Sequence, residues 1–235
     1  MVPRVSIVIP VYNEGSQVEP ILKRIAASVG FEHEILVVYD DDSDSTLPTL
    51  KLLQRDNPSF VPVLNSLGKG PAKAIRSGFL VASAPVVIVT MADGCDDPDQ
   101  VGDLVKLVER GVVIASASRY VKGGQQVGGP WVKSIVSRLA GKSLFYLARV
   151  GTRDATNSFK AYSRQFVNEV QIESEHGFEI GLELVAKARR RRLPVAEIPT
   201  IWLDRSFGVS NFKFSRWLPH YIKWYIYAFG AKISK

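Results

Sequence analysis

Four groups of polar residues in this sequence each follow a run of apolar residues. They are Tyr12–Glu14, Asp40–Asp44, Asp93–Asp97 and Arg205–Ser210. Carboxylates gathered in one place repel one another unless a cation or hydrogen-bond donors satisfy them. A hard divalent cation such as Mg²⁺ or Mn²⁺ binds one or two carboxylates and completes its shell with phosphate oxygens, and arginine adds bidentate hydrogen bonds to the same phosphates. These residue types therefore predict a site for a cation and a phosphorylated ligand.

Each group taken alone also has a purely structural explanation. A helix cap explains Asp40–Asp44 about as well as a ligand site does. Asp93, Asp96 and Asp97 can equally form a polar turn after a strand. For all four groups together, the structural explanation is much weaker.

The hydrophobic pattern predicts an alternation of strands and helices that would bring these groups together. Buried strands are expected at Val5–Val11, Glu34–Tyr39, Phe60–Leu64 and Val86–Thr90, with helices at Val18–Val29, Leu47–Arg55 and Ala72–Val81. Such an alternation implies an α/β fold in which helices flank a mostly parallel central sheet. The carboxyl ends of parallel strands share one edge of the sheet, so the polar groups can line a single cleft there.

The second half of the chain is expected to continue the same architecture. The expected helices are Gln100–Arg110, Trp131–Val150, Phe178–Ala188 and Leu218–Phe229, and the expected strands are Val112–Ser116, Val195–Trp202 and one entered through Asp154–Tyr162. Between them, Ser118–Pro130 contains two glycine pairs and is expected to be a flexible polar loop. We divide the chain into a main domain, residues 1–212, and a C-terminal helix within residues 213–235.

The C-terminal helix is expected to be amphipathic and aromatic. One helical stripe holds four aromatic residues and an alanine, namely Trp217, Tyr221, Trp224, Tyr225 and Ala228, with basic residues elsewhere. Aromatic residues beside basic ones suit a helix that lies in the headgroup region of a membrane. The alternative is a helix packed on the main domain or in a homodimer, and the sequence does not choose between them.

Composition narrows the class of protein. The chain has 235 residues, of which 46% are hydrophobic, and its net charge of +7 favours an anionic partner such as a phosphorylated substrate, a membrane surface or nucleic acid. Its basic residues are scattered without a stacking aromatic motif, so nucleic acid is the weakest of these. The single cysteine, Cys95, excludes an intrachain disulfide and suits a reducing compartment. No apolar run is long enough for a secretory signal or a membrane span, so we expect a cytoplasmic protein, with peripheral contact at the inner face of the membrane left open.

Several short motifs resemble those of the family 2 glycosyltransferases of GT-A fold. They are Ile9–Glu14 (IPVYNE), Asp40–Thr46 (DDDSDST) and Gly68–Gly70 (GKG). Ser118–Gly124 (SRYVKGG) is similar to the dolichol-phosphate mannose synthase-like branch, which glycosylates polyprenyl phosphates. Further matches to that branch are Gly177-Phe178 with Glu183, Glu197–Pro199, and Arg205 with Gly208 and Ser210. The resemblance covers most of the chain, from about Val5 to Ser210, and implies a Rossmann-like nucleotide-binding half.

The resemblance also implies roles for individual residues. Those that would hold the nucleotide are Pro10, Tyr12, Glu14 and Asp41, with Lys69 in the same site. Asp93 would bind Mg²⁺ or Mn²⁺ as the last aspartate of the family's Asp-x-Asp motif. Arg119 and Lys133 would face an acceptor phosphate, and Arg205 would bind the donor diphosphate from a loop that closes over it. Asp93, Arg119 and Arg205 would thus act directly in catalysis.

The sequence departs from the family pattern in the metal-binding motif. The first aspartate of that motif falls at Met91, which cannot bind a hard cation, and the branch's glutamine falls near Cys95. Either Asp93 holds the metal, with Asp96 or Asp97 re-aimed to help, or metal binding is weak. The second polar group is also one residue shorter than usual before Asp44, which leaves the role of Asp44 open.

The implied reaction moves a hexose from a GDP- or UDP-sugar to a polyprenyl phosphate, with inversion at the anomeric carbon in one in-line displacement. A phosphomonoester is largely dianionic at about pH 7, so it is already a nucleophile and needs positioning by cationic side chains rather than a general base. A hydroxyl acceptor would instead need a carboxylate base such as Asp154, Glu179 or Glu183. Two alternatives remain, namely a soluble acceptor with the same donor chemistry and, because of Met91, a sugar-nucleotide-binding protein without turnover.

Overall fold

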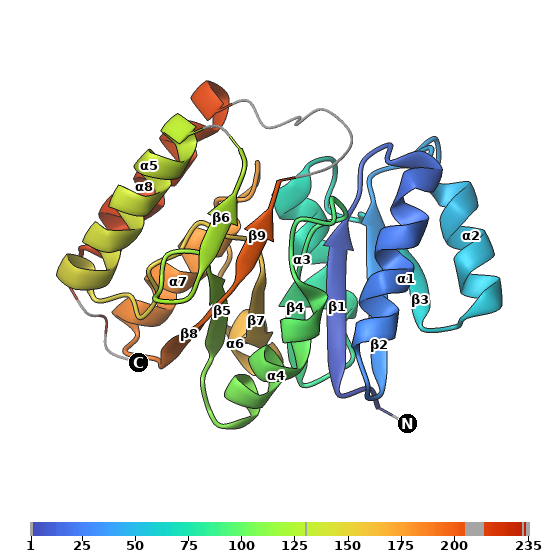
Figure 1. Ribbon diagram of the computed structural model, residues 1–235, viewed down its shortest axis with the longest axis horizontal. Helices are drawn as coiled ribbons and strands as arrows, with labels where there is room; N and C mark the ends of the chain where they lie inside the picture. The colour runs from blue at the N-terminus through green and yellow to red at the C-terminus, as the bar shows by residue number, and fades with distance from the viewer. Residues whose placement is uncertain (1, 130, 205–213, 232, 234–235) are drawn as a thin grey trace.

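The computed structural model describes residues 2–129, 131–204, 214–231 and 233, and only the backbone of residues 132, 133 and 214–216. Its centre is a seven-stranded sheet in the order β3-β2-β1-β4-β7-β5-β8 (Figure 1). The strands are β1 Val5–Pro10, β2 His33–Tyr39, β3 Phe60–Leu64, β4 Val86–Val89, β5 Ile114–Ser118, β7 Lys160–Ser163 and β8 Val195–Pro199. Every neighbouring pair is parallel except those of β7, which runs antiparallel to β4 and β5. The expectation of a mostly parallel α/β sheet is confirmed.

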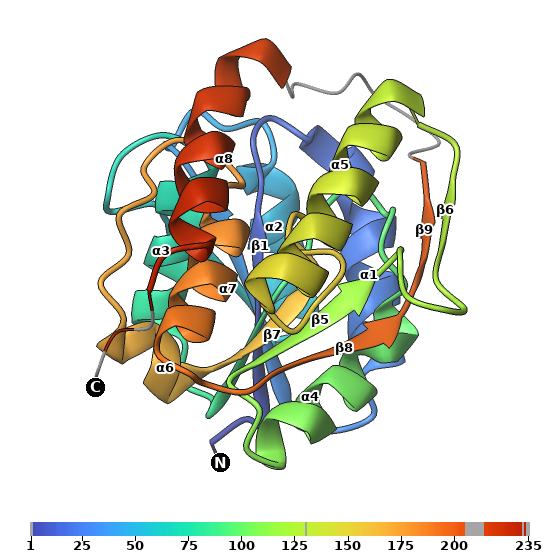
Figure 2. The same ribbon diagram turned by 90° about the vertical axis from the view of Figure 1, so that its left-hand side faces the viewer.

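Helices cover both faces of this sheet (Figures 1 and 2). One face carries α1 (Val18–Ser28), α2 (Leu47–Asp56) and α4 (Val101–Glu109), whose apolar side chains join one core cluster. The other carries α3 (Pro71–Val81), α6 (Arg164–Glu169) and α7 (Ile180–Arg190), which join a second cluster. Because both faces are covered, β1 and β4 are buried at every position, which explains why their sequences are apolar apart from Ser6 rather than alternating.

The C-terminal helix α8 (Phe214–Ala228) packs against α7. Trp224 and Ala228 from the aromatic stripe are 2% and 0% exposed, because they join the core cluster on that face of the sheet. Of the two roles considered for the stripe, packing on the main domain is therefore the one that these side chains show. Beside α8 lies α5 (Trp131–Ser143), which continues into a π-helical turn, Leu144–Ala148 (Figure 2).

Two sequence-based boundaries are wrong in the same region. Within the segment expected to be a flexible loop, Gln125–Val127 forms strand β6, and it pairs in parallel with β9 (Ile201–Leu203). The single strand expected at Val195–Trp202 is divided between β8 and β9, which belong to different sheets. Thr200 makes the switch, since its N–H donates to Ser118 while its carbonyl accepts from Gln125. These pairings join residues far apart in the chain, so local patterns do not show them.

None of the helices in the described ranges is long and apolar enough to cross a membrane.

The close approach of α3 to β1 depends on Gly78. A Cβ atom at this position would lie 2.3 Å from Cγ1 of Val8, so Gly78→Ala must push the helix away from the strand. Overpacking of this kind costs about 1–3 kcal/mol, while the better helix propensity of alanine offsets about 1 kcal/mol. We expect Gly78→Ala to lower the free energy of unfolding in urea by up to about 2 kcal/mol.

Gly102→Ala in α4 is the matched control. Its Cβ atom would meet Cε1 of Phe31 at 3.9 Å, an ordinary van der Waals contact. With no clash to oppose the gain in helix propensity, we expect Gly102→Ala to raise the free energy of unfolding by about 0.5–1 kcal/mol. Equal effects of the two substitutions would contradict the close packing of α3 on β1.

Candidate active site

The loops that leave β1 and β2 are fastened to one another at the carboxyl edge of the sheet. Both carboxylate oxygens of Asp44 accept hydrogen bonds from the backbone N–H of Asn13 at 3.1 Å, and Oδ1 also accepts from the N–H of Thr46 at 2.8 Å. The Thr46 hydroxyl accepts from the N–H of Glu14 at 3.0 Å. Asp44 is 5% exposed, so it acts as a structural clasp that fixes the first polar group against the second.

Asp41 and Lys69, both predicted to hold the nucleotide, form an ion pair at this edge. The Lys69 ammonium lies 2.7 Å from Oδ2 of Asp41, and both side chains are accessible to solvent. The hydrogen bond from Lys69, together with those from Ser43, lowers the pKa of Asp41 to about 2. Next to it, Asp40 accepts hydrogen bonds from the N–H of Gly70 at 3.0 Å and from Asn65 at 2.7 Å. The structure thus brings the Asp40–Asp44 group and the Gly68–Gly70 turn together.

The remaining predicted nucleotide residues lie at the exit of β1. Pro10 ends the strand and is buried, whereas Tyr12 is 56% exposed and Glu14 is also accessible. Because β1 is the neighbour of β2, these residues lie beside Asp41, with the Asn13–Asp44 clasp between the two loops. An accessible aromatic ring and carboxylates at this edge are the residue types that stack on a base and accept hydrogen bonds from ribose hydroxyls.

The loop after β4 holds three aspartates that have different partners. Oδ1 of Asp93 accepts a hydrogen bond from the N–H of Cys95 at 3.1 Å, and Oδ2 of Asp96 accepts one from the Thr90 hydroxyl at 2.8 Å. Asp97 caps the short 3₁₀ helix η2 (Pro98–Gln100) by accepting from the N–H of Asp99 at 3.2 Å. Burial, and then the neighbouring Asp93 carboxylate, raises the pKa of Asp96 to about 7. Asp93 and Asp96 therefore form the interacting pair of carboxylates, while Asp97 has a structural role.

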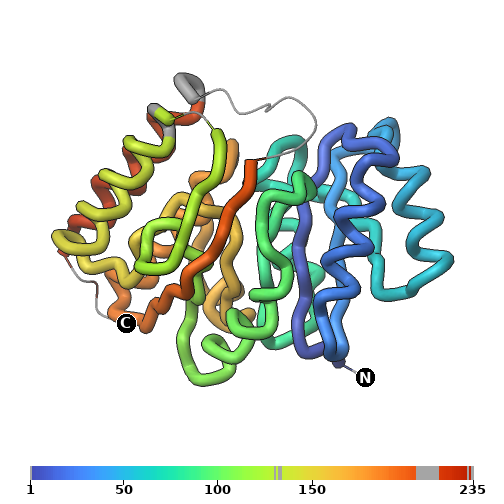
Figure 3. The backbone as a smooth tube through the Cα atoms, in the orientation of Figure 1, coloured from blue at the N-terminus to red at the C-terminus, as the bar shows by residue number. Residues whose placement is uncertain are grey.

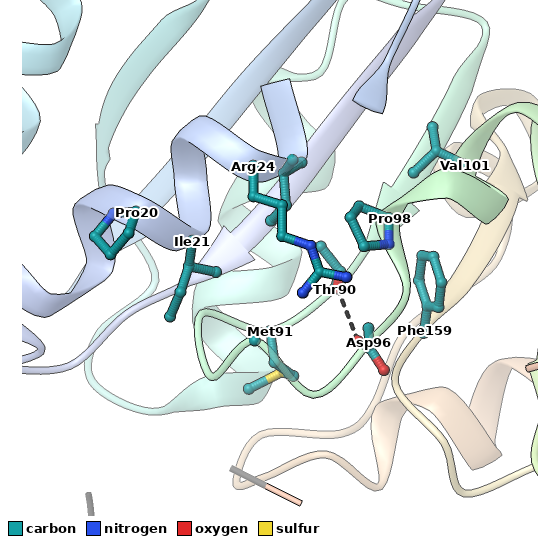
Figure 4. A pocket seen from close by; sticks show the side chains of 11 residues that line it. Pro20, Ile21, Arg24, Thr90, Met91, Asp96, Pro98, Val101 and Phe159 are labelled. Atoms are coloured by element: carbon teal, nitrogen blue, oxygen red, sulfur yellow. Dashed lines mark hydrogen bonds between the residues drawn. The ribbon is translucent and has the colours of Figure 1, made fainter. Parts of the chain in front are cut away.

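Met91 borders a small pocket between α1 and this loop (Figure 4). The pocket has a volume of about 190 Å³. Most of its lining is apolar, with Arg24, Thr90 and Asp96 as polar exceptions; the apolar residues are Pro20, Ile21, Ile25, Met91, Gly94, Pro98, Val101 and Phe159. The position of the family's first motif aspartate thus belongs to an apolar contact with α1, and with Asp97 capping η2 the candidate metal ligands of this loop are Asp93 and Asp96.

The carboxylate ligands of this loop fit a divalent cation that is bound mostly through its substrate. Within the described ranges there is no group of three or more histidine, cysteine or acidic residues that could hold a metal ion. Mg²⁺ and Mn²⁺ do not need such a group, because they are commonly held by one or two carboxylates together with phosphate oxygens and water. The Asp93–Asp96 pair supplies that number of hard oxygen ligands, so the residues present fit a divalent ion that arrives with a diphosphate.

Arg119, at the end of β5, is held by a buried bidentate ion pair. Its Nε lies 2.7 Å from Oδ2 of Asp154 and its Nη2 lies 2.9 Å from Oδ1, while its backbone N–H donates to the same carboxylate at 3.0 Å. The side chains of Arg119 and Asp154 are 13% and 0% exposed. Burial by itself would lower the pKa of Arg119, but the Asp154 carboxylate outweighs it and holds the pKa above its ordinary value.

Arg119 nevertheless keeps donors for a ligand. The Asp154 carboxylate engages the edge of the guanidinium formed by Nε and Nη2. Nη1 has no hydrogen-bond acceptor in the part of the chain that the structure describes. Arginine carries five N–H donors in a fixed fork, so an arginine paired in this way still presents its Nη1 side to an anion.

The other two predicted cations fall outside the description. Lys133 lies in α5, but its side chain is outside the described residues, and so is the whole of Arg205. Within the described residues, β9 lies beside the aspartate loop, because the N–H of Leu203 donates to the carbonyl of Cys95 at 3.1 Å. The backbone trace shows β9 passing next to the loop after β4 (Figure 3).

One charged residue of this region was missed by the sequence analysis. Lys160 in β7 is 0% exposed, and burial lowers its pKa to about 8. Its ammonium donates to the backbone carbonyl of Asn157. The sequence does contain a feature that points to this residue. Lys160 is a lysine inside the otherwise apolar strand of the segment NSFKAY, where a solvated side chain is not expected.

Comparison with known proteins agrees with this geometry. The family model described as Glycosyl transferase family 2 matches residues 6–171, which include the loops after β1, β2 and β4 and the Arg119–Asp154 pair. The chain belongs to glycosyl transferase family 2. The family expected from the sequence motifs is therefore confirmed.

Two relatives of this family 2 chain have names that refer to dolichol or polyprenol and to mannose. A dolichol-phosphate mannosyltransferase from Pyrococcus furiosus is 30% identical over 217 residues, which are 89% of this chain and 59% of the relative. A polyprenol monophosphomannose synthase from Mycolicibacterium smegmatis is 29% identical over 214 residues, which are 88% of this chain and 80% of the relative. The family 2 chain thus spans less than two thirds of the first relative and most of the second.

Solved structures share the fold of this family 2 chain. Glucosyl-3-phosphoglycerate synthase from Mycobacterium tuberculosis, in complex with Mn²⁺, uridine diphosphate and glucosyl-3-phosphoglycerate, has a TM-score of 0.70 at 17% identity and covers 97% of this chain and 81% of its own. A mannosyltransferase from Pyrobaculum calidifontis, in complex with GDP-mannose and Mn²⁺, has a TM-score of 0.64 at 18% identity and covers 97% and 63%. At these identities the likeness shows the fold, and it confirms the expected GT-A architecture.

Proposed function

We propose that this chain transfers a hexose from a nucleoside diphosphate sugar to a polyprenyl phosphate. The names of the two sequence relatives support this acceptor, and family membership supports the reaction class. In the displacement, an oxygen of the acceptor phosphate attacks the anomeric carbon from the side opposite the diphosphate. The bond from that carbon to the diphosphate oxygen breaks, and the nucleoside diphosphate leaves with the electron pair.

The donor binds at the carboxyl edge formed by β1, β2 and β4. The base and ribose contact Tyr12, Glu14 and the Asp41–Lys69 pair, and the buried Pro10 lies beneath these residues at the end of β1. Asp93, with Asp96, would hold a Mg²⁺ or Mn²⁺ ion, which would neutralise negative charge on the diphosphate. Arg205, to which the family resemblance gives a role at the donor diphosphate, keeps that role in the proposal.

The observation that carries the proposal is the state of the three candidate bases. Asp154 is paired with Arg119, while Glu179 accepts hydrogen bonds from the N–H of Gly177 at 2.8 Å and from the next residue upstream at 3.2 Å. Glu183 accepts from two backbone N–H groups and lies 2.7 Å from the ammonium of Lys187. All three carboxylates are buried and engaged, which favours an acceptor that needs no base. A phosphate dianion held by Arg119 meets that condition.

An exposed apolar surface favours a lipid over a soluble phosphate. We call it the α5 surface, and its apolar residues, each at least 49% exposed, are Trp131, Ile135, Leu139, Tyr146 and Leu147. Arg138 and Lys142 are exposed among them. Exposed apolar side chains mixed with basic ones suit the interface of an anionic membrane, from which a polyprenyl chain could present its phosphate. The α5 surface, rather than the buried stripe of α8, is the membrane contact in this proposal.

The test is nucleoside diphosphate release. Purified protein is incubated with Mn²⁺ and a panel of UDP- and GDP-sugars, with and without farnesyl phosphate in phosphatidylglycerol vesicles. We expect release from one donor to depend on the lipid phosphate and to yield a glycosylated lipid. Equal release with and without it would favour a soluble acceptor or hydrolysis. Donor binding without release under any condition would favour a binding protein without turnover.

The pKa of Asp96 predicts how donor binding depends on pH. Protons compete with a metal ion for a carboxylate, and burial raises the pKa of Asp96 to about 7. We therefore expect the Mn²⁺-dependent affinity for GDP or UDP, measured by calorimetry, to rise between about pH 6 and pH 8 and then to level off. Asp96→Asn should flatten this profile, whereas Asp97→Asn, which preserves the cap of η2, should retain it. The same profile in both variants would exclude Asp96 from the metal site.

A further inference from the structure

A buried lysine, Lys160, holds the turn that carries Asp154. The N–H of Asn157 donates to the carbonyl of Asp154 at 3.4 Å, which closes the turn, and Nδ2 of Asn157 donates to the carbonyl of Ala117 at 2.9 Å. The Lys160 ammonium donates to the carbonyl of Asn157. A Cβ atom at Gly181, in the first turn of α7, would lie 3.7 Å from Nζ of Lys160, so the helix closes over the ammonium.

These contacts form a continuous connection from Lys160 to Arg119. Lys160 fixes Asn157, Asn157 fixes the turn, and the turn places the Asp154 carboxylate against the guanidinium. The charges of these residues also compensate one another. Burial acts to raise the pKa of Asp154, but the cations Arg119 and Lys160 keep it below its ordinary value. A buried cation is costly unless it has such partners, so Lys160 at this position is unexplained by packing alone.

We propose that Asp154 and Lys160 are a buried positioning pair that holds Arg119 with its Nη1 side directed to the acceptor phosphate. This inference rests on the proposed function, since it assigns the pair to the acceptor rather than to the donor. Neither residue touches substrate, and both act through the orientation of one guanidinium. Pre-organisation of this kind matters because a bidentate phosphate contact is lost when the fork of an arginine rotates.

The kinetic test uses Asp154→Asn and Lys160→Met. We expect the KM for farnesyl phosphate to rise about 10-fold in each variant, as when one charge-assisted hydrogen bond is misaligned, while the KM for the donor and the affinity for GDP or UDP stay unchanged. The matched control breaks a buried ion pair that does not contact the Asp154 turn. Lys187→Met removes the buried lysine paired with Glu183. This control should leave the acceptor KM unchanged.

A pH profile separates positioning from simple stability. The charged groups acting on Lys160 are Asp154, Arg119 and Asp96, and burial lowers its pKa to about 8. Loss of the ammonium above that pH should raise the acceptor KM of the wild-type protein between about pH 7.5 and pH 9. Lys160→Arg, which stays charged throughout, should give a flat profile in this range. Tm values are measured for each variant, and only folded variants enter the comparison.

The outcomes distinguish this inference from the proposed function. If the wild-type protein neither binds nor glycosylates farnesyl phosphate, the proposed function fails and the positioning pair fails with it. If the wild-type protein does glycosylate it, an unchanged acceptor KM in Asp154→Asn would overturn the pair alone. So would an equal loss of donor and acceptor affinity, or a wild-type profile that Lys160→Arg does not flatten.

Discussion

Replacing Asp93 with alanine is expected to abolish the metal-dependent binding of a nucleoside diphosphate to this chain. In the loop after β4, Met91 lines an apolar pocket and Asp97 caps η2, so the cation depends on Asp93 and Asp96. The family resemblance assigns the cation to Asp93, the last aspartate of the Asp-x-Asp motif, so Asp93 is the main metal ligand of the proposal. A metal ion acting on a leaving diphosphate is worth several kcal/mol, so kcat should fall by about 100-fold or more.

Calorimetry measures this prediction without turnover. GDP and UDP are titrated into wild-type protein and Asp93→Ala with Mn²⁺ or with EDTA. The wild-type protein should bind more tightly with Mn²⁺, and the variant should show the same weak affinity in both conditions. Asp97→Asn is the control, because the replacement keeps a capping oxygen and leaves both proposed ligands in place. If Asp93→Ala retains the Mn²⁺-dependent gain in affinity, the cation is held elsewhere.

The first half of the fold follows from the sequence because its signals are local. β1 and β4 are buried at every position and β2 over most of its length, so each is a largely apolar run whose length gives its bounds, and the edge strand β3 is a short apolar run of the same kind. β3 has the bounds expected from the sequence, and the others agree within a residue or two at each end. The polar groups after β1, β2 and β4 come to one edge as expected, because parallel pairing leaves that edge as their common end.

The second half depends on contacts that a local pattern does not contain. β6 exists because it pairs with β9, and the chain changes sheets at Thr200 after a strand that looks continuous in sequence. The aromatic stripe of α8 has the composition of a membrane-interface helix, yet Trp224 is buried against α7. An apolar helix face shows that something covers it, and only the tertiary structure shows what does.

The residue types of the candidate site were predictable from the sequence, but the separate role of each residue was not. Sequence could not separate a capping aspartate from a ligating one. Asp44 and Asp97 prove to be caps or clasps, whereas Asp93 and Asp96 form a carboxylate pair. Asp154 was considered only as a base for a hydroxyl acceptor, because its partner Arg119 lies far away in the chain. The role of a charged residue thus depends on a partner that can lie far away in the chain. A direct test of Arg119 is therefore informative.

Arg119→Lys is expected to weaken the acceptor site while leaving the donor site intact. Lysine keeps the positive charge beside the buried Asp154 carboxylate, so the variant avoids an unpaired buried charge. It lacks the planar fork, however, and a single ammonium cannot pair with Asp154 on one side and present aligned donors on the other. Charge-assisted hydrogen bonds are worth about 1.5–3 kcal/mol, so the KM for farnesyl phosphate should rise about 10- to 100-fold.

The variant that matches it is Arg153→Lys. Arg153 is paired with Glu197 close to the same turn, but this pair does not contact Arg119, so loss of its fork should leave the acceptor KM unchanged. The decisive quantity is the ratio of acceptor to donor effects, since a general loss of folding would lower both affinities together. If Arg119→Lys weakens GDP or UDP binding as much as it weakens farnesyl phosphate binding, Arg119 belongs to the donor diphosphate. In that case the acceptor phosphate must be recognised by other cations, of which Lys133 is the one that the sequence nominates.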